Sequence, residues 1–205
     1  LLCTIIQFLG LSLSNNECYD AWECQSQELS GSVLCYGYQS CESSTITSNY
    51  YVPCAGYKSC INSNIISSNT IACNGNYACS NAQLSSPDVL RCHGNSGCYG
   101  ADIDAVNIIA NGVYALNAAT IDSNDQIRVN IYSKGYLSGM NANIVCRSGK
   151  MCNLYCSGNG CQDLNFGCLA GSTCTVSPSI CNPLRPNSKS DLLREDNENA
   201  NEESE

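Results

Sequence analysis

The chain has 205 residues, of which 18 are Cys and only 13% carry a charge, with one His, two Met and one Trp. This cysteine content is typical of a disulfide scaffold, and the abundance of Asn, Ser and Gly favours turn-rich β structure over helix. The composition excludes a helical bundle, a coiled coil and a doubly wound nucleotide-binding domain, and the formal charge of −9 excludes a basic nucleic-acid binder.

Residues 1–14 have the character of a truncated signal peptide. The apolar run LLCTIIQFLGL is too short to cross a bilayer, and Ser12-Leu13-Ser14 supplies small residues just before a cleavage site. We therefore expect a secreted chain that begins at Asn15 and folds in an oxidising compartment, where cysteines pair. No later apolar stretch approaches the roughly 20 residues that a membrane helix needs, so no membrane span is expected.

An internal repeat of 17–19 residues dominates the sequence from Asn15 onward. Two cysteines separated by five residues recur, and Gly stands second after the first Cys in CYGYQSC, CAGYKSC, CNGNYAC and CHGNSGC. Apolar residues recur two places before the first Cys and eleven places after it. This pattern, bounded by Gly, Asn and Ser, is typical of strands. It predicts an all-β fold, a single parallel β-helix of the usual right hand, with one coil per repeat.

The cysteine-free stretch between Cys98 and Cys146 is predicted to keep the frame of the repeat. Apolar or small residues stand where cysteines and inward strand residues are expected, so two further coils fit there. About eight coils then run over 15–152, followed by an irregular cysteine-rich cap over 153–182 and a disordered acidic tail over 183–205. The replacing residues are Ala110 and Val129 for the first Cys, Leu116 and Gly135 for the second, and Ile108, Ile127 and Ile144 for the apolar residue before each unit.

Two disulfide patterns fit stacked coils: a bridge inside each coil, or a bridge between like positions of neighbouring coils. Cα atoms stacked about 4.8 Å apart would satisfy disulfide geometry in the second pattern too. Each column holds five consecutive cysteines, so pairing between coils would leave one over in each column, whereas pairing within coils leaves none. Bridges within coils are therefore predicted, with Cys181 left over. The pairs are Cys18–Cys24, Cys35–Cys41, Cys54–Cys60, Cys73–Cys79, Cys92–Cys98, Cys146–Cys152, Cys156–Cys161 and Cys168–Cys174.

A group of acidic residues is the candidate chemical site. Asp104 and Asp122 both lie twelve places after their unit starts, which should stack them on one face. Stacked carboxylates beside Lys or Arg hold Ca²⁺ or act as acid and base in pectate-lyase-like β-helices. The alternative is a charged outer face without a ligand, which the lack of a catalytic signature favours. The group comprises Asp102, Asp104, Asp122 and Asp125, with Arg91, Arg128, Lys134 and Arg147 in nearby coils.

No other metal or cofactor is expected, because zinc motifs need C-x2-C or His spacing and His93 stands alone. Ice binding is not expected either, since only Thr45-Ile46-Thr47 resembles a Thr-x-Thr ladder. Tyrosines three or four places into the bridged loop are predicted to form a row, which would either stack on sugar rings or shield the disulfides as an aromatic ladder. They are Tyr38, Tyr57, Tyr77, Tyr114 and Tyr132.

The repeat as a whole resembles the cysteine-rich, pectin-lyase-like parallel β-helix proteins that protists secrete. The resemblance covers about Asn15 to Cys174, concerns architecture, and implies an extracellular or surface-coat setting without transferring site residues. The sequence therefore predicts a non-catalytic structural or binding protein of an extracellular layer, with a carbohydrate-active β-helix as the alternative. Expected partners are glycans, or a second copy or another domain stacked end-on near Leu29 and Val33, because too few residues precede Cys18 to form a cap.

Overall fold

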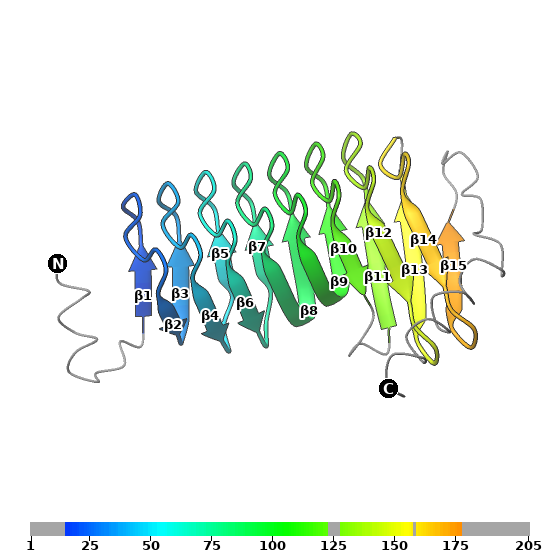
Figure 1. The fold of residues 1–205 in the computed structure, drawn as a ribbon, viewed down its shortest axis with the longest axis horizontal. Helices are drawn as coiled ribbons and strands as arrows, with labels where there is room; N and C mark the ends of the chain where they lie inside the picture. The colour runs from blue at the N-terminus through cyan, green and yellow to red at the C-terminus, as the bar shows by residue number, and fades with distance from the viewer. Residues whose placement is uncertain (1–14, 123–127, 158, 178–205) are drawn as a thin grey trace, which may run out of the picture.

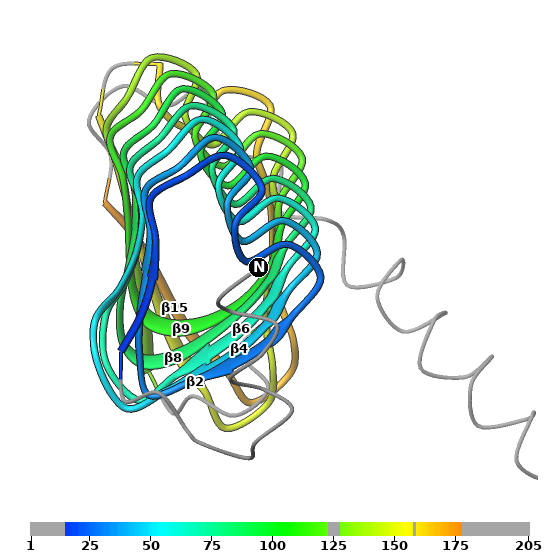
Figure 2. The same ribbon diagram turned by 90° about the vertical axis from the view of Figure 1, so that its left-hand side faces the viewer.

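A computed structural model describes residues 15–122, 128–157 and 159–177, and these residues form one parallel β-solenoid (Figure 1). Successive coils are stacked along one axis, and the view along that axis shows them superimposed around an elongated cross-section (Figure 2). The fold is therefore the all-β parallel solenoid that the repeat predicts. Nothing in the described part of the chain is a helix capable of crossing a membrane.

The strands form two ladders along the stack, and each coil contributes to both. The first ladder contains β1 (Asn15–Cys18), β3 (Ser32–Cys35), β5 (Val52–Cys54), β7 (Ile71–Cys73), the second halves of β8 (Gln83–Cys92) and β9 (Asp102–Ala110), then β11 (Arg128–Ser133), β13 (Met151–Cys156) and β15 (Thr173–Ser177). The second contains β2 (Glu28–Ser30), β4 (Thr45–Ser48), β6 (Asn64–Ser67), the first halves of β8 and β9, then β10 (Thr120–Asp122), β12 (Asn143–Cys146) and β14 (Asn165–Cys168). We call the turn after each first-ladder segment the first corner, which forms the loops at the top of Figure 1, and the turn after each second-ladder segment the second corner.

Burial alternates along both ladders, which explains why apolar residues recur at fixed places. The inward side chains are almost completely buried, while their neighbours along each strand are mostly polar or partly exposed. Burying one such aliphatic side chain contributes roughly 1.5–3 kcal/mol. The inward residues are Val33, Val52, Ile71, Leu90, Ile108, Ile131 and Leu154 in the first ladder, and Leu29, Ile46, Ile65, Leu84, Ile103, Ile121 and Ile144 in the second.

The predicted frame of the coils holds as far as Ala110 and is wrong beyond it. Ala110 pairs with Ser133, which pairs with Cys156, so the next coil starts 23 residues after Ala110 and not at Val129. Gly135 consequently stands second after a coil start, where other coils also have glycine, and does not replace a second cysteine.

The inward residues beyond Ala110 shift with the frame. Ile144 pairs with Ile121 and belongs to the second ladder, so the residue two places before the coil start is Ile131. Ile127 lies outside the described residues. The wrong ladder was predicted for Ile144 for a physical reason. Both ladders alternate inward aliphatic residues with polar ones, so this alternation does not tell which ladder a residue belongs to once the coil length changes.

The solenoid also extends further toward the C-terminus than predicted. The irregular cap expected over 153–182 is wrong for residues 153–177, because β13, β14 and β15 continue both ladders in register. The longer coils of this part hid its periodicity, since Cys146 pairs with Cys168, 22 residues on. Residues 1–14, with the predicted signal peptide, and 178–205, with Cys181 and the predicted acidic tail, lie outside the described residues.

Close backbone contact at the first corner accounts for the glycine two places after the coil starts from Cys35 to Ser133. A Cβ added at Gly75 would lie 2.1 Å from the carbonyl oxygen of Gly56 in the preceding coil, and other coils repeat this contact. That distance is far inside van der Waals contact, so a side chain would force adjacent coils apart. The stacked glycines are Gly37, Gly56, Gly75, Gly94, Gly112 and Gly135.

The first corner also holds non-glycine residues in the left-handed backbone conformation. In the coil that starts at Cys54, Lys58 and Asn62 have φ angles of 56° and 59°. Their amides donate to the carbonyl oxygens of Asn76 and Ser80 in the next coil, both at 3.0 Å. The hydrogen-bond ladder between coils therefore maintains a conformation that costs roughly 1–2 kcal/mol per residue.

Gly75→Ala is expected to lower the free energy of unfolding by about 3 kcal/mol or more, because the blocking atom is a backbone oxygen that no rotamer change can move. Gly167→Ala is the matched control, since its added Cβ would meet nothing closer than 3.8 Å. The control should change stability by less than about 0.5 kcal/mol. Denaturant unfolding under non-reducing conditions compares the two, and equal effects would contradict the close-stacking account.

Candidate functional site

Eight disulfides close corners of the solenoid. Each joins a cysteine at the end of a strand to a second cysteine five or six residues further along the chain. Their Cα–Cα distances run from 5.7 to 6.4 Å, within the range of ordinary disulfides. Those at the first corner of the N-terminal coils are stacked in consecutive coils, from Cys18–Cys24 to Cys92–Cys98. The pairs are those predicted from the parity of the columns, and the remaining three are Cys146–Cys152, Cys156–Cys161 and Cys168–Cys174.

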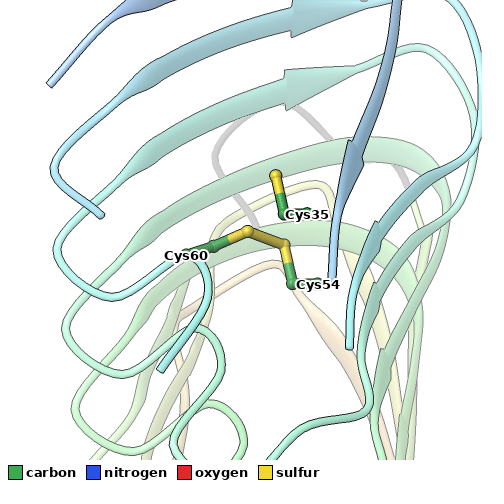
Figure 3. Close-up of side chains that lie close together, drawn as sticks. All are labelled: Cys35, Cys54 and Cys60. Atoms are coloured by element: carbon green, nitrogen blue, oxygen red, sulfur yellow. A yellow bond between two sulfur atoms is a disulfide. The ribbon is translucent and has the colours of Figure 1, made fainter. Parts of the chain in front are cut away.

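The stacked disulfides bring sulfur atoms of neighbouring coils close together. The Sγ atoms of Cys35, Cys54 and Cys60 lie within 4.8 Å of one another, and Figure 3 shows the Cys35 sulfur beside the Cys54–Cys60 bridge. Three thiolates at this distance could hold a soft metal ion. Because Cys35 is bonded to Cys41 and the other two to each other, none of these sulfurs is a thiolate, and the group is a structural cross-link.

Two of the disulfides, Cys146–Cys152 and Cys168–Cys174, lie at the second corner, so the prediction that Cys146 starts a coil is wrong. Cys146 pairs with Cys168 in the second ladder, and Cys152 pairs with Cys174 in the first. In coils nearer the N-terminus, serines take the place of Cys146, two residues after the inward aliphatic residue of the second ladder. Their Oγ atoms accept hydrogen bonds from the amides of Tyr50, Asn69 and Asp88 at 3.0, 3.1 and 3.2 Å; the serines are Ser48, Ser67 and Ser86.

A pair of serine hydroxyls closes the first corner in the coil that starts at Ser133. Ser133 stands in the column of first cysteines, and its Oγ lies 2.5 Å from the Oγ of Ser138. Both side chains are completely buried, and Ser133 Oγ also donates to the carbonyl oxygen of Gly160 at 2.6 Å. A hydrogen-bonded pair thus replaces the covalent bridge in this coil. The two serines are five residues apart in the sequence, as are Cys156 and Cys161 in the next coil.

The predicted acidic group lies beside an open depression of about 520 Å³ on the outer face of the second ladder. Ile103 pairs with Ile121, so Asp104 and Asp122, the next residues of β9 and β10, lie side by side as the unit spacing predicted. Asp125 lies outside the described residues. The lining residues of this outer-face depression are Asn64, Ile66, Gln83, Leu84, Ser85, Asp102, Ile103, Asp104, Thr120 and Asp122.

One carboxylate of the outer-face depression is held by an arginine of the following coil. Arg147 donates from Nε and a terminal nitrogen to the two carboxylate oxygens of Asp122, at 2.7 and 2.5 Å. The arginine side chain is 49% exposed and the aspartate 23%, so the pair is a partly solvated surface bridge. Its fork geometry still fixes the Asp122 carboxylate in place.

Other basic residues of the predicted group lie elsewhere. Arg91 belongs to the first-ladder half of β8, and Lys134 places its ammonium 5.7 Å from the ring centre of Tyr132. The Arg128 side chain lies outside the described part of the structure. Partial burial and the nearby charge of Arg91 lower the pKa of His93, which is not among the residues lining the depression.

A column of polar side chains runs along the outer face of the second ladder. Asn64, Gln83, Asp102 and Thr120 pair in successive coils, and their side chains alternate with the inward aliphatic residues. Glu28 and Thr45 precede them in the same column, so a single threonine stands between a carboxylate and two amides. The stretch therefore presents varied hydrogen-bonding groups about 4.8 Å apart, without the regular threonine ladder that ice binding would require.

The predicted tyrosine row is partly correct. Tyr38 lies 5.4 Å from Tyr57, which lies 6.1 Å from Tyr77, and Trp22 extends this row at 5.5 Å from Tyr38. The coil after Tyr77 has Ser96 at the corresponding place, which interrupts the row. Trp22 was not among the predicted residues, all of which are tyrosines.

The two other predicted tyrosines lie apart from this row. Tyr114 contacts Tyr136 at 6.4 Å, beyond the interruption. Placing Tyr132 in the bridged loop is wrong, because the coil starts at Ser133; Tyr132 lies on β11 and stacks on Tyr155 at 4.8 Å. Sequence reasoning also missed the stacked pair of Tyr19 and Tyr36, at 5.5 Å.

Ring orientation decides what the row can do. The rings of Tyr38 and Tyr57 are 12° from parallel and stacked, so their faces contact each other along the solenoid axis. The ammonium of Lys58 lies 5.4 Å from the ring centre of Tyr57. A sugar ring stacks on an open aromatic face, and this arrangement instead favours an aromatic ladder over the disulfide corner.

Comparison with known proteins adds no relationship: no family model matches the chain, and neither a curated protein nor a solved structure matches it significantly.

Replacing Ser133 and Ser138 together by cysteine is expected to create a ninth bridge in the described part of the chain. The hydroxyls are already at 2.5 Å, and a loop of this length should raise the free energy of unfolding by about 2 kcal/mol. Thiol titration and thermal unfolding measure both effects. Ser138→Cys alone, which has no partner at Ser133, is the control. Two more free thiols in the double variant than in the unmodified protein would contradict the placement of Ser133 in the cysteine column.

Proposed function

We propose that this chain is a non-catalytic, disulfide-stapled structural element of an extracellular layer. The observation that carries the proposal is the uninterrupted stack of five bridges from Cys18–Cys24 to Cys92–Cys98, one in each successive coil. A solenoid is stabilised by contacts between neighbouring coils, so its local elements can open separately. A covalent bridge in each coil opposes that local opening, which suits a rod exposed to proteases and changing solvent.

The extracellular setting is supported by cysteine chemistry. Sixteen cysteines in eight bridges require an oxidising environment to form and persist. The apolar run at residues 1–11, read as part of a signal peptide, agrees with export. The architectural resemblance to the cysteine-rich β-helices that protists secrete points the same way.

The outer-face depression supports a structural role more than an enzymatic one. Acid–base catalysis by carboxylates depends on a water-excluding site that sets the two groups to different tasks. The depression is open to solvent, and the Arg147 fork already occupies both oxygens of Asp122. Such a surface favours an outer face of charged and polar groups over a reaction centre.

Carbohydrate binding is a second candidate, favoured by one observation. The column Asn64, Gln83, Asp102 and Thr120 presents hydrogen-bonding side chains at the regular spacing of the coils along the depression. A chain of sugar hydroxyls lying along the rod could meet these groups one after another. Ca²⁺ between the carboxylates of Asp102 and Asp104 would be an aid to such binding in this second proposal.

A glycan array followed by a polysaccharide digestion assay separates the candidates. The structural proposal predicts no bound glycan and no released sugar, with or without added Ca²⁺. Glycan binding without release would select the second candidate. Release of reducing or unsaturated sugars, lost in Asp104→Ala and Asp122→Ala but retained in Asp163→Ala outside the depression, would overturn the non-catalytic proposal.

A further inference from the structure

At each end of the solenoid, the outermost strands have one edge without a strand partner among the described residues. Among the described residues, β1 pairs only with β3 and β2 only with β4 at one end, while β14 pairs only with β12 and β15 only with β13 at the other. The outer edges of these strands direct amide and carbonyl groups along the rod axis. Such edges are templates for pairing with another strand.

The register of the ladders makes the two ends compatible with each other. Glu17 pairs with Leu34, one place before a coil start, and Ser177 pairs with Tyr155, also one place before a coil start. The outer edge of β15 is therefore in the register at which β1 of a following copy would pair with it. Figure 2 shows the first-ladder strands of successive coils in one wall, which would continue from one copy into the next.

Charge is distributed unequally along the rod. Residues 15–57 contain five acidic residues and no Lys or Arg, whereas residues 128–177 contain four basic residues and one acidic residue. Lys150 lies one coil from the C-terminal edge, since its carbonyl oxygen accepts a hydrogen bond from the amide of Thr173 in β15 at 2.9 Å. Coils about 4.8 Å apart place such charges within a Debye length of the end at physiological salt.

These charges discriminate between the ways in which two copies could meet. Contact between two N-terminal ends would bring acidic coils together. Contact between two C-terminal ends would bring the four basic residues of 128–155 in each copy near each other, across end coils whose one charged residue is Asp163. Contact of unlike ends pairs opposite charges, which steers encounter and suppresses the wrong orientation. A head-to-tail contact of this kind does not close, so repeated association gives an open filament.

We propose that this protein associates head to tail with further copies of itself, the outer edge of β15 in one copy pairing with the outer edge of β1 in the next. The contact would extend the first ladder in register and would be guided by the acidic N-terminal and basic C-terminal coils. This inference deepens the proposed structural role, but its test measures assembly and is independent of any result with glycans.

Sedimentation velocity of the full chain over a range of concentrations, with two charge-reversed variants, tests the proposal. Glu17→Lys/Glu28→Lys/Glu42→Lys changes the charge of residues 15–57 from −5 to +1 and makes both ends basic, and Lys134→Glu/Lys150→Glu changes that of residues 128–177 from +3 to −1 and makes both ends acidic. We expect the unmodified protein to associate, with an association constant at least about tenfold lower in 0.5 M salt. Each variant alone is expected to remain monomeric. A 1:1 mixture of the two variants should associate again, because a head-to-tail contact between the two different variants pairs opposite charges.

Asp88→Lys, an exposed charge reversal on β8 in the middle of the rod, is the matched control and should associate like the unmodified protein. The segment 191–205 is retained throughout, so any competition by its seven acidic residues is included in the measured affinity. A monomer at every concentration would overturn the proposal. So would association that persists in each variant alone, or a mixture of the variants that stays monomeric.

Discussion

The backbone hydrogen-bond ladder between parallel coils is the interaction on which the rest of the structure depends. It pairs Cys54 with Cys73 and Cys73 with Cys92, and so places like residues directly on like residues. Adjacent coils lie only about 4.8 Å apart, so each column must contain side chains that tolerate contact with their own kind. Glycine at the first corner, aliphatic residues inside and aromatic rings outside are three answers to this one requirement.

Closing the corners is a separate requirement, and the chain meets it with several chemistries. Disulfides close the first corner in the N-terminal coils, while Ala110 and Leu116 fill the same space with buried apolar groups in the next coil. Ser133 and Ser138 do so with a hydrogen bond. At the second corner, serine hydroxyls close the turn in the N-terminal coils, and disulfides close it near the C-terminus. Near the C-terminus covalent closure therefore occurs at both corners, since Cys156–Cys161 closes the first.

The sequence was sufficient to predict the parallel solenoid, the coil starts as far as Ala110 and the disulfide partners. In the first five coils, repetition of a cysteine pair marks the coil start, and parity of the columns decides the partners. Beyond Ala110 the same cysteine spacing recurs at the second corner in Cys146–Cys152, and the alternation of apolar residues is the same in both ladders. Ile144 could therefore be assigned to the wrong ladder, and Tyr132 to the wrong corner, without any local conflict. The Arg147–Asp122 pair and the ring-on-ring orientation of the tyrosines depend on side-chain conformations that spacing does not encode.

Disulfide mapping after cleavage at glutamate tests the account most directly. Cleavage after Glu28 and Glu42 in the denatured, unreduced protein at acid pH releases residues 29–42, which contain Cys35 and Cys41 and no other cysteine. If bridges close single coils, this peptide appears alone, two hydrogens lighter than its reduced mass. Recovery of residues 29–42 covalently joined to the peptide that contains Cys54 would show bridges between coils and would contradict the account.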